Sequence, residues 1–405
     1  MNKSSSQFLD RTKPPHIATL ILISGISALS MNVFLPSLPN MAAYFDADYA
    51  LLQLSISAYL GFSALLQLII GPISDRFGRR RILLVSMGVF VVASIGTLLA
   101  PTAEIFLVFR MLQAAIATAM ALSRAIVRDM VDEARAASMI AYVTLGMSIV
   151  PMLGPVVGGL LDEMFGWKAS FGVLLVLGLL VWALTWADLG ETTVNRPTSF
   201  KAQVREYPAL LTSPRFWGYV LTTAFASGTF FAYLGGAPFV GSEIYGLSPS
   251  ELGLYFGVTG AGYGLGNFLS GRFSVRVGTI RMIVMGNITM AAGLSLQTMA
   301  VLTGLGGALG FFAPFLLVGT GNGLLLPNSN AGMLSVRPHL AGTASGLGGA
   351  IMIGGGAALS ALAGAMLTPE TGAWPLIAIM ALSLTGSFLS IGIVIRRNRR
   401  LGLSV

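Results

Sequence analysis

Long uncharged, apolar stretches recur along the whole chain. An apolar run of about 18 or more residues can cross the roughly 30 Å hydrocarbon core of a bilayer as a helix. Of the 405 residues, 55% are hydrophobic and only 10% are charged, whereas soluble globular proteins carry about 25% charged residues. The chain lacks the polar surface that a soluble fold needs. We therefore predict an all-α membrane protein.

Apolar runs separated by polar residues give twelve candidate transmembrane helices. The first six lie near residues 17–38, 50–71, 82–100, 104–127, 136–161 and 168–187. The second six lie near residues 216–240, 250–270, 280–302, 308–330, 341–366 and 373–395. The longest polar stretch separates the two sets. We therefore expect an N-terminal six-helix bundle over residues 1–187, a cytoplasmic linker over 188–215 and a C-terminal six-helix bundle over 216–405.

The placement of lysine and arginine predicts the orientation of the chain. If the N-terminus is cytoplasmic, nearly all basic residues fall in the inner loops and the two tails, as the positive-inside rule requires. The opposite loops hold one basic residue, Lys168, among several acids. We therefore expect both termini in the cytoplasm. The net charge of +8 reflects this topology and does not indicate a nucleic-acid partner.

An arginine-rich motif occurs twice. GPISDRFGRRRIL begins at Gly71, and the fainter copy GRFSVRVGTIRMI begins at Gly271. Glycine, serine and arginine recur at one constant offset, in the pairs Gly71/Gly271, Ser74/Ser274, Arg76/Arg276, Gly78/Gly278 and Arg81/Arg281. Both copies follow the second span of their half, so a six-span unit is repeated in one orientation. Parallel repeats of this kind, with a substrate site between them, are an architecture of secondary transporters.

The first copy carries more than a topology signal. Arginines alone would hold the loop inside, but they do not require the acid Asp75, which suggests an ion-pair network. The stretch resembles the major facilitator superfamily signature Gly-x-x-x-Asp-Arg-x-Gly-Arg-Arg, matched by Gly71, Asp75, Arg76, Gly78, Arg79 and Arg80. The resemblance implies a cytoplasmic latch made by Asp75 and Arg79 with Asp129. The second copy has Val275 in place of the acid, which implies a weaker latch.

Span four contains an arginine, Arg110, roughly 9 Å below the outer face. A cation at this depth usually faces a cavity or a partner, although it can also snorkel to the interface. Gln113 follows at i+3, on the same helix face. The pair resembles the Arg-x-x-Gln motif of the drug:proton antiporter branch, with Ala114 where that branch has glycine. The resemblance implies a role in proton coupling or in the substrate cavity.

Span five is rich in proline and in closely spaced small residues, which bend helices and let them pack closely. It resembles the antiporter motif Gly-Pro-x-x-Gly-Gly of export-type major facilitators, matched by Gly154, Pro155, Gly158 and Gly159. The resemblance implies an exporter rather than an importer.

Span one resembles the Bcr/CflA drug-resistance transporters in FLPSLP, which starts at Phe34, but Asn32 replaces the family aspartate. Asn32 lies roughly 22 Å up a 30 Å core, near the depth of Arg110, so the two could face one cavity. Asparagine cannot titrate. Three alternatives follow. Asp75, Asp129 or Glu104 handles the protons, or the coupling of transport to protons is lost. The third is that the asparagine is an engineered substitution. Asn32 either contacts substrate or bonds a neighbouring backbone group.

The leading hypothesis is a secondary exporter of small, largely apolar compounds, working by alternating access and proton antiport. The alternative is an uncoupled or single-metabolite transporter of the same fold, suggested by Asn32. Further candidate cavity residues are Tyr59, Met147, Pro151, Tyr233 and Asn267. The chain lacks cysteine and has two histidines, so we expect no enzyme, metal site or cofactor. The expected partners are substrate, protons and the lipid bilayer. The resemblance to the Bcr/CflA transporters implies a monomer in a bacterial inner membrane.

Overall fold

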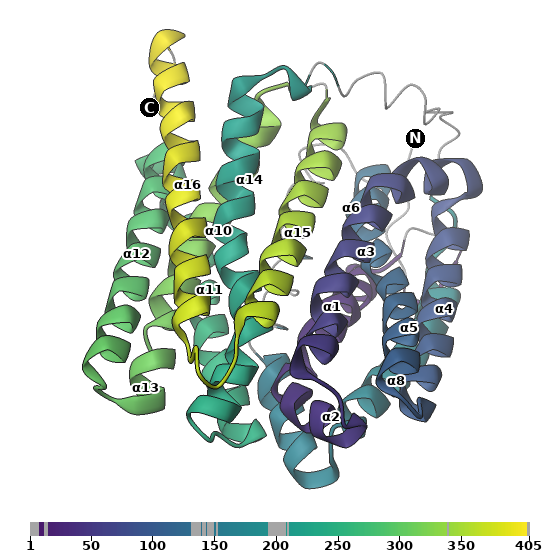
Figure 1. Ribbon diagram of the computed structural model, residues 1–405. Helices are drawn as coiled ribbons and strands as arrows, with labels where there is room; N and C mark the ends of the chain where they lie inside the picture. The colour runs from purple at the N-terminus through teal and green to yellow at the C-terminus, as the bar shows by residue number, and fades with distance from the viewer. Residues whose placement is uncertain are drawn as a thin grey trace.

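The computed structural model describes residues 8–11, 15–130, 139, 143, 150, 153–192, 208, 210–337 and 340–402. Within these residues every regular element is a helix, and the long helices run up and down between two ends of the molecule (Figure 1). This confirms the predicted all-helical class.

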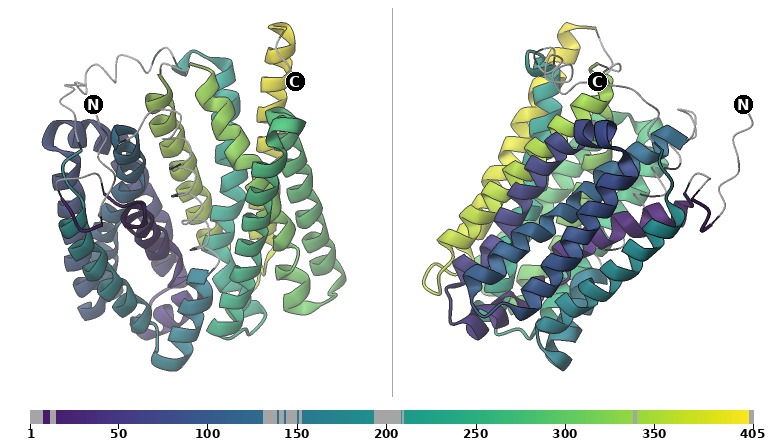
Figure 2. Two further views of the ribbon diagram at one scale, coloured as in Figure 1. Left: turned by 180° about the vertical axis from the view of Figure 1, so that it is seen from behind. Right: turned by 90° about the vertical axis from the view of Figure 1, so that its right-hand side faces the viewer.

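The helices form two groups that stand side by side in the views from the front and from behind (Figures 1 and 2). The first group contains α1 (Ile17–Asn32), α2 (Leu38–Phe45), α3 (Tyr49–Phe77), α4 (Arg79–Leu99), α5 (Ala103–Gln113), α6 (Thr118–Met130), a helix over residues 153–165, and α8 (Lys168–Asp188). The second contains α10 (Pro214–Phe239), α11 (Pro249–Val277), α12 (Thr279–Thr303), α13 (Gly307–Phe312), α14 (Phe315–Ser335), α15 (Ala341–Met366) and α16 (Trp374–Arg400). The groups meet where α3 packs along α15.

Ten segments of the described chain are long and apolar enough to cross a membrane. They match ten of the twelve predicted spans. The eighth predicted span corresponds to α11, a helix of 29 residues with a more polar composition. The fifth, near 136–161, falls on residues that the structure describes only in part.

Two predicted spans are broken at prolines, which cannot donate the backbone hydrogen bond that a helix needs. The span near 17–38 ends as α1 at Asn32 and continues through the short 3-10 turn η1 (Leu35–Ser37), which contains Pro36, into α2. The span near 308–330 is interrupted between α13 and α14, next to Pro314. Hydropathy predicts one continuous span in each case, because proline interrupts the helical hydrogen bonds without interrupting the run of apolar residues.

The arginine-rich motif was expected to form a loop from Gly71 onward, and this is wrong. Helix α3 continues to Phe77, and the chain turns at Gly78 alone before α4 starts at Arg79. The turn needs glycine because its φ is +91°, and Gly278 repeats it with φ +93° between α11 and α12. The two copies of the motif therefore fold alike.

We call the end of the molecule that holds Gly78, Gly278 and Arg400 the arginine end, and the opposite end the far end. The N-terminal segment also lies at the arginine end, because the backbone N–H groups of Leu9 and His16 donate to the Asp188 carboxylate at the end of α8. The far end holds the short connections 46–48 and 367–373.

Candidate transport site

Arg110 lies on α5 with none of its surface exposed. Its Nε donates to the Ser55 carbonyl at 3.2 Å, and its Nη2 donates to the Ser30 carbonyl at 2.8 Å. Its Nη1 donates to Ser30 Oγ at 3.2 Å and to Gln113 Oε1 at 2.9 Å. The guanidinium is thus held inside the first bundle by α1 and α3. The alternative that Arg110 snorkels to the membrane surface is wrong.

Two aromatic rings complete the surroundings of Arg110. Its Cζ lies 4.0 Å from the Tyr59 ring centroid and 4.5 Å from the Phe34 centroid. Aromatic faces attract a cation, and more strongly where water is excluded. All partners that the described residues supply to this guanidinium are neutral. Neutral dipoles and ring faces therefore stabilise the cation here.

Gln113 links this cluster to α4. Its oxygen accepts from Arg110, as the i+3 spacing predicts, and its Nε2 donates to Ser94 Oγ at 2.9 Å. The Ser94 hydroxyl in turn donates to the Phe90 carbonyl at 2.8 Å. Hydrogen bonds thus link Arg110, Gln113 and Ser94 in series, which fixes these three side chains in one arrangement.

Asn32 does not join the Arg110 cluster by any described contact. Its Nδ2 donates to the Ala28 carbonyl at 2.8 Å, one turn back on α1, and only 3% of its surface is exposed. The Asn32 Cβ lies 3.7 Å from the position that a Cβ methyl group would take if Gly154 were replaced by alanine. Ser30, two residues earlier, is the α1 residue that faces Arg110. Residues two apart point about 200° apart around a helix, so equal depth did not imply a shared face.

The glycines of span five lie at close helix contacts. A methyl group at Gly158 would overlap the Val33 carbonyl oxygen at the end of α1, and one at Gly159 would overlap the Pro249 carbonyl oxygen at the start of α11. A methyl group at Gly253 of α11 would likewise overlap the Pro155 carbonyl oxygen. The motif therefore lets the two bundles touch directly. Met147 and Pro151 lie outside the described residues.

A buried glutamine that the sequence analysis missed joins the two bundles. Gln53 of α3 donates from Nε2 to the Ser360 carbonyl at 2.6 Å and to Ser360 Oγ at 2.8 Å. Its side chain fills a socket beside Gly235 and Gly364, where added methyl groups would lie 2.6 Å from Gln53 atoms. Nearby, the Tyr49 hydroxyl donates to the Gly235 carbonyl at 3.0 Å. We call the set of Tyr49, Gln53, Gly235, Ser360 and Gly364 the far-end seam.

The arginine motif makes the ion pairs expected of it. Arg79 pairs with Asp75 at 3.0 Å and also with Asp129 of α6. Its backbone N–H donates to Glu191 Oε1 at 2.9 Å, so a carboxylate lies at the N-terminus of α4, where the helix dipole favours negative charge. Arg80 donates to the Leu189 carbonyl at 2.6 Å. Three helices and the segment after α8 are thereby joined.

Other members of the motif lie apart from these ion pairs. Arg76 is exposed, with its Cζ 5.3 Å from the Phe77 ring centroid. A methyl group at Gly71 would meet open space. Val275, at the position corresponding to Asp75, is 96% exposed, so the second copy lacks an acid that could pair there.

Tyr233 and Asn267 lie in the second bundle. The Tyr233 ring stacks on Phe315 with centroids 3.8 Å apart, and its hydroxyl accepts a hydrogen bond from Thr259 at 3.4 Å. Asn267 donates to the Tyr263 carbonyl at 2.9 Å on its own helix. These contacts are local to the second bundle and do not bring either residue to Arg110.

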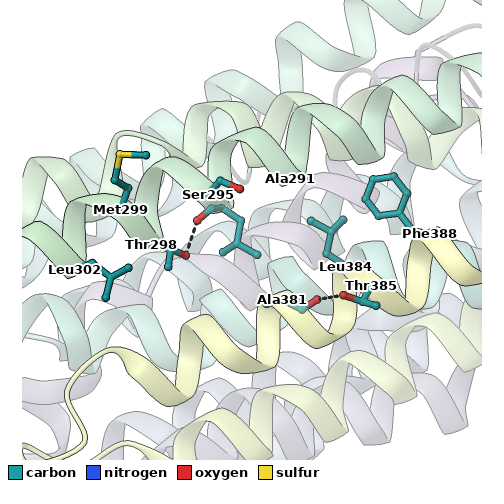
Figure 3. A pocket seen from close by; sticks show the side chains of 10 residues that line it. Ala291, Ser295, Thr298, Met299, Leu302, Ala381, Leu384, Thr385 and Phe388 are labelled. Atoms are coloured by element: carbon teal, nitrogen blue, oxygen red, sulfur yellow. Dashed lines mark hydrogen bonds between the residues drawn. The ribbon is translucent and has the colours of Figure 1, made fainter.

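A groove of about 520 Å³ lies between α12 and α16 (Figure 3). Its hydroxyl groups bond back to their own helices, Thr298 to the Leu294 carbonyl at 2.7 Å and Thr385 to the Ala381 carbonyl at 2.8 Å. It therefore offers an apolar surface, and its rim residues Met299 and Leu302 are 59% and 68% exposed. None of the predicted site residues lines it.

Comparisons with known proteins agree with this architecture. The Major Facilitator Superfamily model matches residues 20–361. The chain is 33% identical to the uncharacterized MFS-type transporter YdgK of Bacillus subtilis, covering 89% of the chain and 90% of that protein. It is 32% identical to a chloramphenicol resistance protein of Pseudomonas aeruginosa, covering 94% and 91%. A peptide transporter solved in complex with sulfate has the same fold, with a TM-score of 0.76, 14% identity and 95% coverage of both chains. The chain belongs to the major facilitator superfamily and is a membrane transporter rather than an enzyme.

Proposed function

We propose that this transporter exports small, largely apolar compounds in exchange for protons, as a Bcr/CflA-type member of the drug:proton antiporter branch. The observation that carries the proposal is the near full-length similarity to the chloramphenicol resistance protein, 32% identical over 94% of the chain. The glycines at 154, 158 and 159 support the export direction through their resemblance to the antiporter motif, and those at 158 and 159 lie at close helix contacts.

In this proposal the two bundles, residues 1–187 and 216–405, rock against each other about the linker 188–215. The arginine end is cytoplasmic, because it carries most of the basic residues. The ion pairs of Arg79 latch that end in one state, and the far-end seam closes the outer end in the other. Arg110 and Gln113 supply polar groups near the path of the substrate. The protein works as a monomer.

Proton antiport needs a titratable group, and the three acids named for this role lie at the two ends of the molecule. Asp75 and Asp129 both pair with Arg79, and Glu104 is exposed at the far end of α5. Asn32 cannot titrate, and the described partners of Arg110 are neutral. This observation favours a second candidate, a facilitative transporter that moves neutral or anionic compounds without protons.

Transport of chloramphenicol by the purified chain in proteoliposomes, with a pH-sensitive dye inside, separates the two candidates. Antiport predicts that a proton gradient drives chloramphenicol against its concentration gradient and that drug addition moves protons. Facilitated transport predicts equilibration with no proton movement, and coupling that appears when Asn32→Asp restores an acid. Absence of chloramphenicol movement under both conditions would refute export of this compound.

Arg276→Gln is a suitable control for arginine variants, because Arg276 is exposed at the arginine end of α11. It removes the same charge without touching the buried cluster. Equal loss of transport in Arg276→Gln and Arg110→Gln would argue that the role of Arg110 is not specific to the path of the substrate.

A further inference from the structure

Asp162 is a buried acid that none of the motifs includes. It lies one residue beyond the predicted fifth span, near the far end of the helix over residues 153–165, and only 5% of its surface is exposed. Its Oδ2 accepts a hydrogen bond from Asn40 Nδ2 at 2.8 Å. Asp162 follows Gly158 by four positions and Gly159 by three, so it shares their helix face.

The surroundings of Asp162 are contacts between the two bundles. Gly159 touches Pro249 and Ser250 at the start of α11. The segment η1–α2, which carries Asn40, packs against α10, and η1 also packs against α11. Asp162 therefore joins two elements of the first bundle that both rest on the second. The carboxylate lies one helical turn from a direct contact between the bundles, the approach of Gly159 to Pro249.

Among the described residues no cation forms an ion pair with Asp162. Lys168, the basic residue at the start of α8, has its Nζ 5.0 Å from the Tyr44 ring centroid instead. Glu163, the next residue on its own helix, is acidic and exposed. The facing side chain from α2, Asn40, is neutral, and Glu251 of α11 is engaged in capping its own helix at Ser248. Burial raises the pKa of Asp162, the hydrogen bond from Asn40 opposes this, and the charge of Glu163 adds to it. An ionised carboxylate buried without a cation is destabilising.

We propose that Asp162 is the proton-binding residue of the outer gate. With the outer end closed, the carboxyl group is buried and the protonated form is favoured. Loss of the proton to the outside solution favours the open form, in which water solvates the carboxylate. The proton enters and leaves on the outer side, so Asp162 sets the balance between closed and open forms and does not carry protons across. This inference rests on the alternating access proposed above.

Spin labels test the gate directly, and the chain helps because it contains no cysteine. We would label the double variant Leu99→Cys/Leu305→Cys, whose side chains are 75% and 69% exposed at the far ends of the two bundles. Distances between the labels are then measured by double electron–electron resonance from pH 5 to pH 8. We expect the longer distance to gain population as pH rises, by at most about tenfold per pH unit for one proton.

Three further variants make the result specific. Asp162→Asn should hold the short distance at every pH, whereas its neighbour Glu163→Gln should keep the pH response. Asn40→Ala removes a hydrogen bond that stabilises the ionised carboxylate in the closed form, so it should raise the population of the longer distance at pH values where Asp162 is ionised. Because Asn40 is exposed, this variant also tests the proposal if Asp162→Asn fails to fold.

A pH-independent distance in the unmodified pair would overturn the assignment, as would a pH response that survives in Asp162→Asn or an unchanged high-pH population of the longer distance in Asn40→Ala. Failure of chloramphenicol transport with an intact pH response would refute the proposed substrate and leave the gate in place. The two proposals therefore fail in different measurements.

Discussion

Arg110 is fully buried in a segment that is apolar enough to span a bilayer. A cation in such a segment is expensive and needs partners within the protein. Two backbone carbonyls, a hydroxyl, an amide oxygen and two ring faces provide them. The geometry depends on the planar, forked shape of the guanidinium, because donors in different directions reach α1 and α3 at once.

Arg110→Lys should therefore behave almost as poorly as Arg110→Ala. A lysine keeps the charge but cannot bond Ser30, Ser55 and Gln113 together, which leaves buried acceptors unpaired at about 1–3 kcal/mol each. We expect at least about a tenfold loss of transport rate, which corresponds to about 1.4 kcal/mol. Transport and thermal melting should be measured for both variants. Wild-type transport by Arg110→Lys would show that charge alone is sufficient.

At the scale of helices, glycine determines how closely elements approach. Gly158 meets the end of α1 through a backbone carbonyl, which cannot move aside as a side chain can. The latch at the arginine end shows a different device, in which charged side chains hold α3, α4 and α6 together. Close packing is insensitive to salt, whereas these partly buried ion pairs weaken with salt to the extent that water reaches them.

Gly158→Ala should destabilise the protein by about 1–3 kcal/mol, because the added methyl group overlaps the Val33 carbonyl oxygen. Gly172→Ala on α8 is the matched control, since nothing lies within 4 Å of its added methyl group. There alanine should stabilise the helix slightly, by up to about 1 kcal/mol. Thermal unfolding in detergent measures both, and equal melting temperatures would contradict the packing argument.

Asp75→Asn should nearly abolish transport while the protein still inserts, because Arg79 loses its ion pair with Asp75. The repeat offers a control at the corresponding position, Val275→Asn, which changes a 96% exposed side chain. We expect this control to transport normally. Proteoliposome transport at equal reconstituted protein is the measurement, and normal turnover of Asp75→Asn would reduce the motif to a topology signal.

At the scale of the whole molecule, the two bundles touch along α3 and α15 and are joined by the far-end seam. The residues of the seam are uncharged, and Gln53 donates hydrogen bonds across it from inside a socket lined by glycine. The equilibrium between closed and open outer ends therefore depends on a few specific contacts, which single substitutions can change.

Gln53→Ala should open the outer end by removing two hydrogen bonds between the bundles. A typical net contribution of about 1 kcal/mol per bond predicts roughly a tenfold or greater shift toward the longer distance between labels at Leu99 and Leu305. Leu54→Ala, at a partly exposed neighbour, should leave the distances unchanged. An unaltered distance distribution in Gln53→Ala would mean that packing alone closes this end.

The sequence by itself determined the features that depend on one helix at a time. Hydropathy located the spans because the bilayer sets a length for each apolar run. The i+3 spacing placed Gln113 beside Arg110, and the repeated motif anticipated the same glycine turn at Gly78 and Gly278. These properties are local, and local chain geometry is enough to derive them.

Only the tertiary structure decided which faces meet. The rotation of α1 about its axis placed Ser30, and not Asn32, against Arg110. Packing between bundles gave Gln53 its socket, and packing within the first bundle brought Asn40 of α2 to the buried Asp162. Hydropathy and depth carry no information about rotation or about which helix is a neighbour. Those depend on the fit of side chains between helices, which is a property of the assembled molecule.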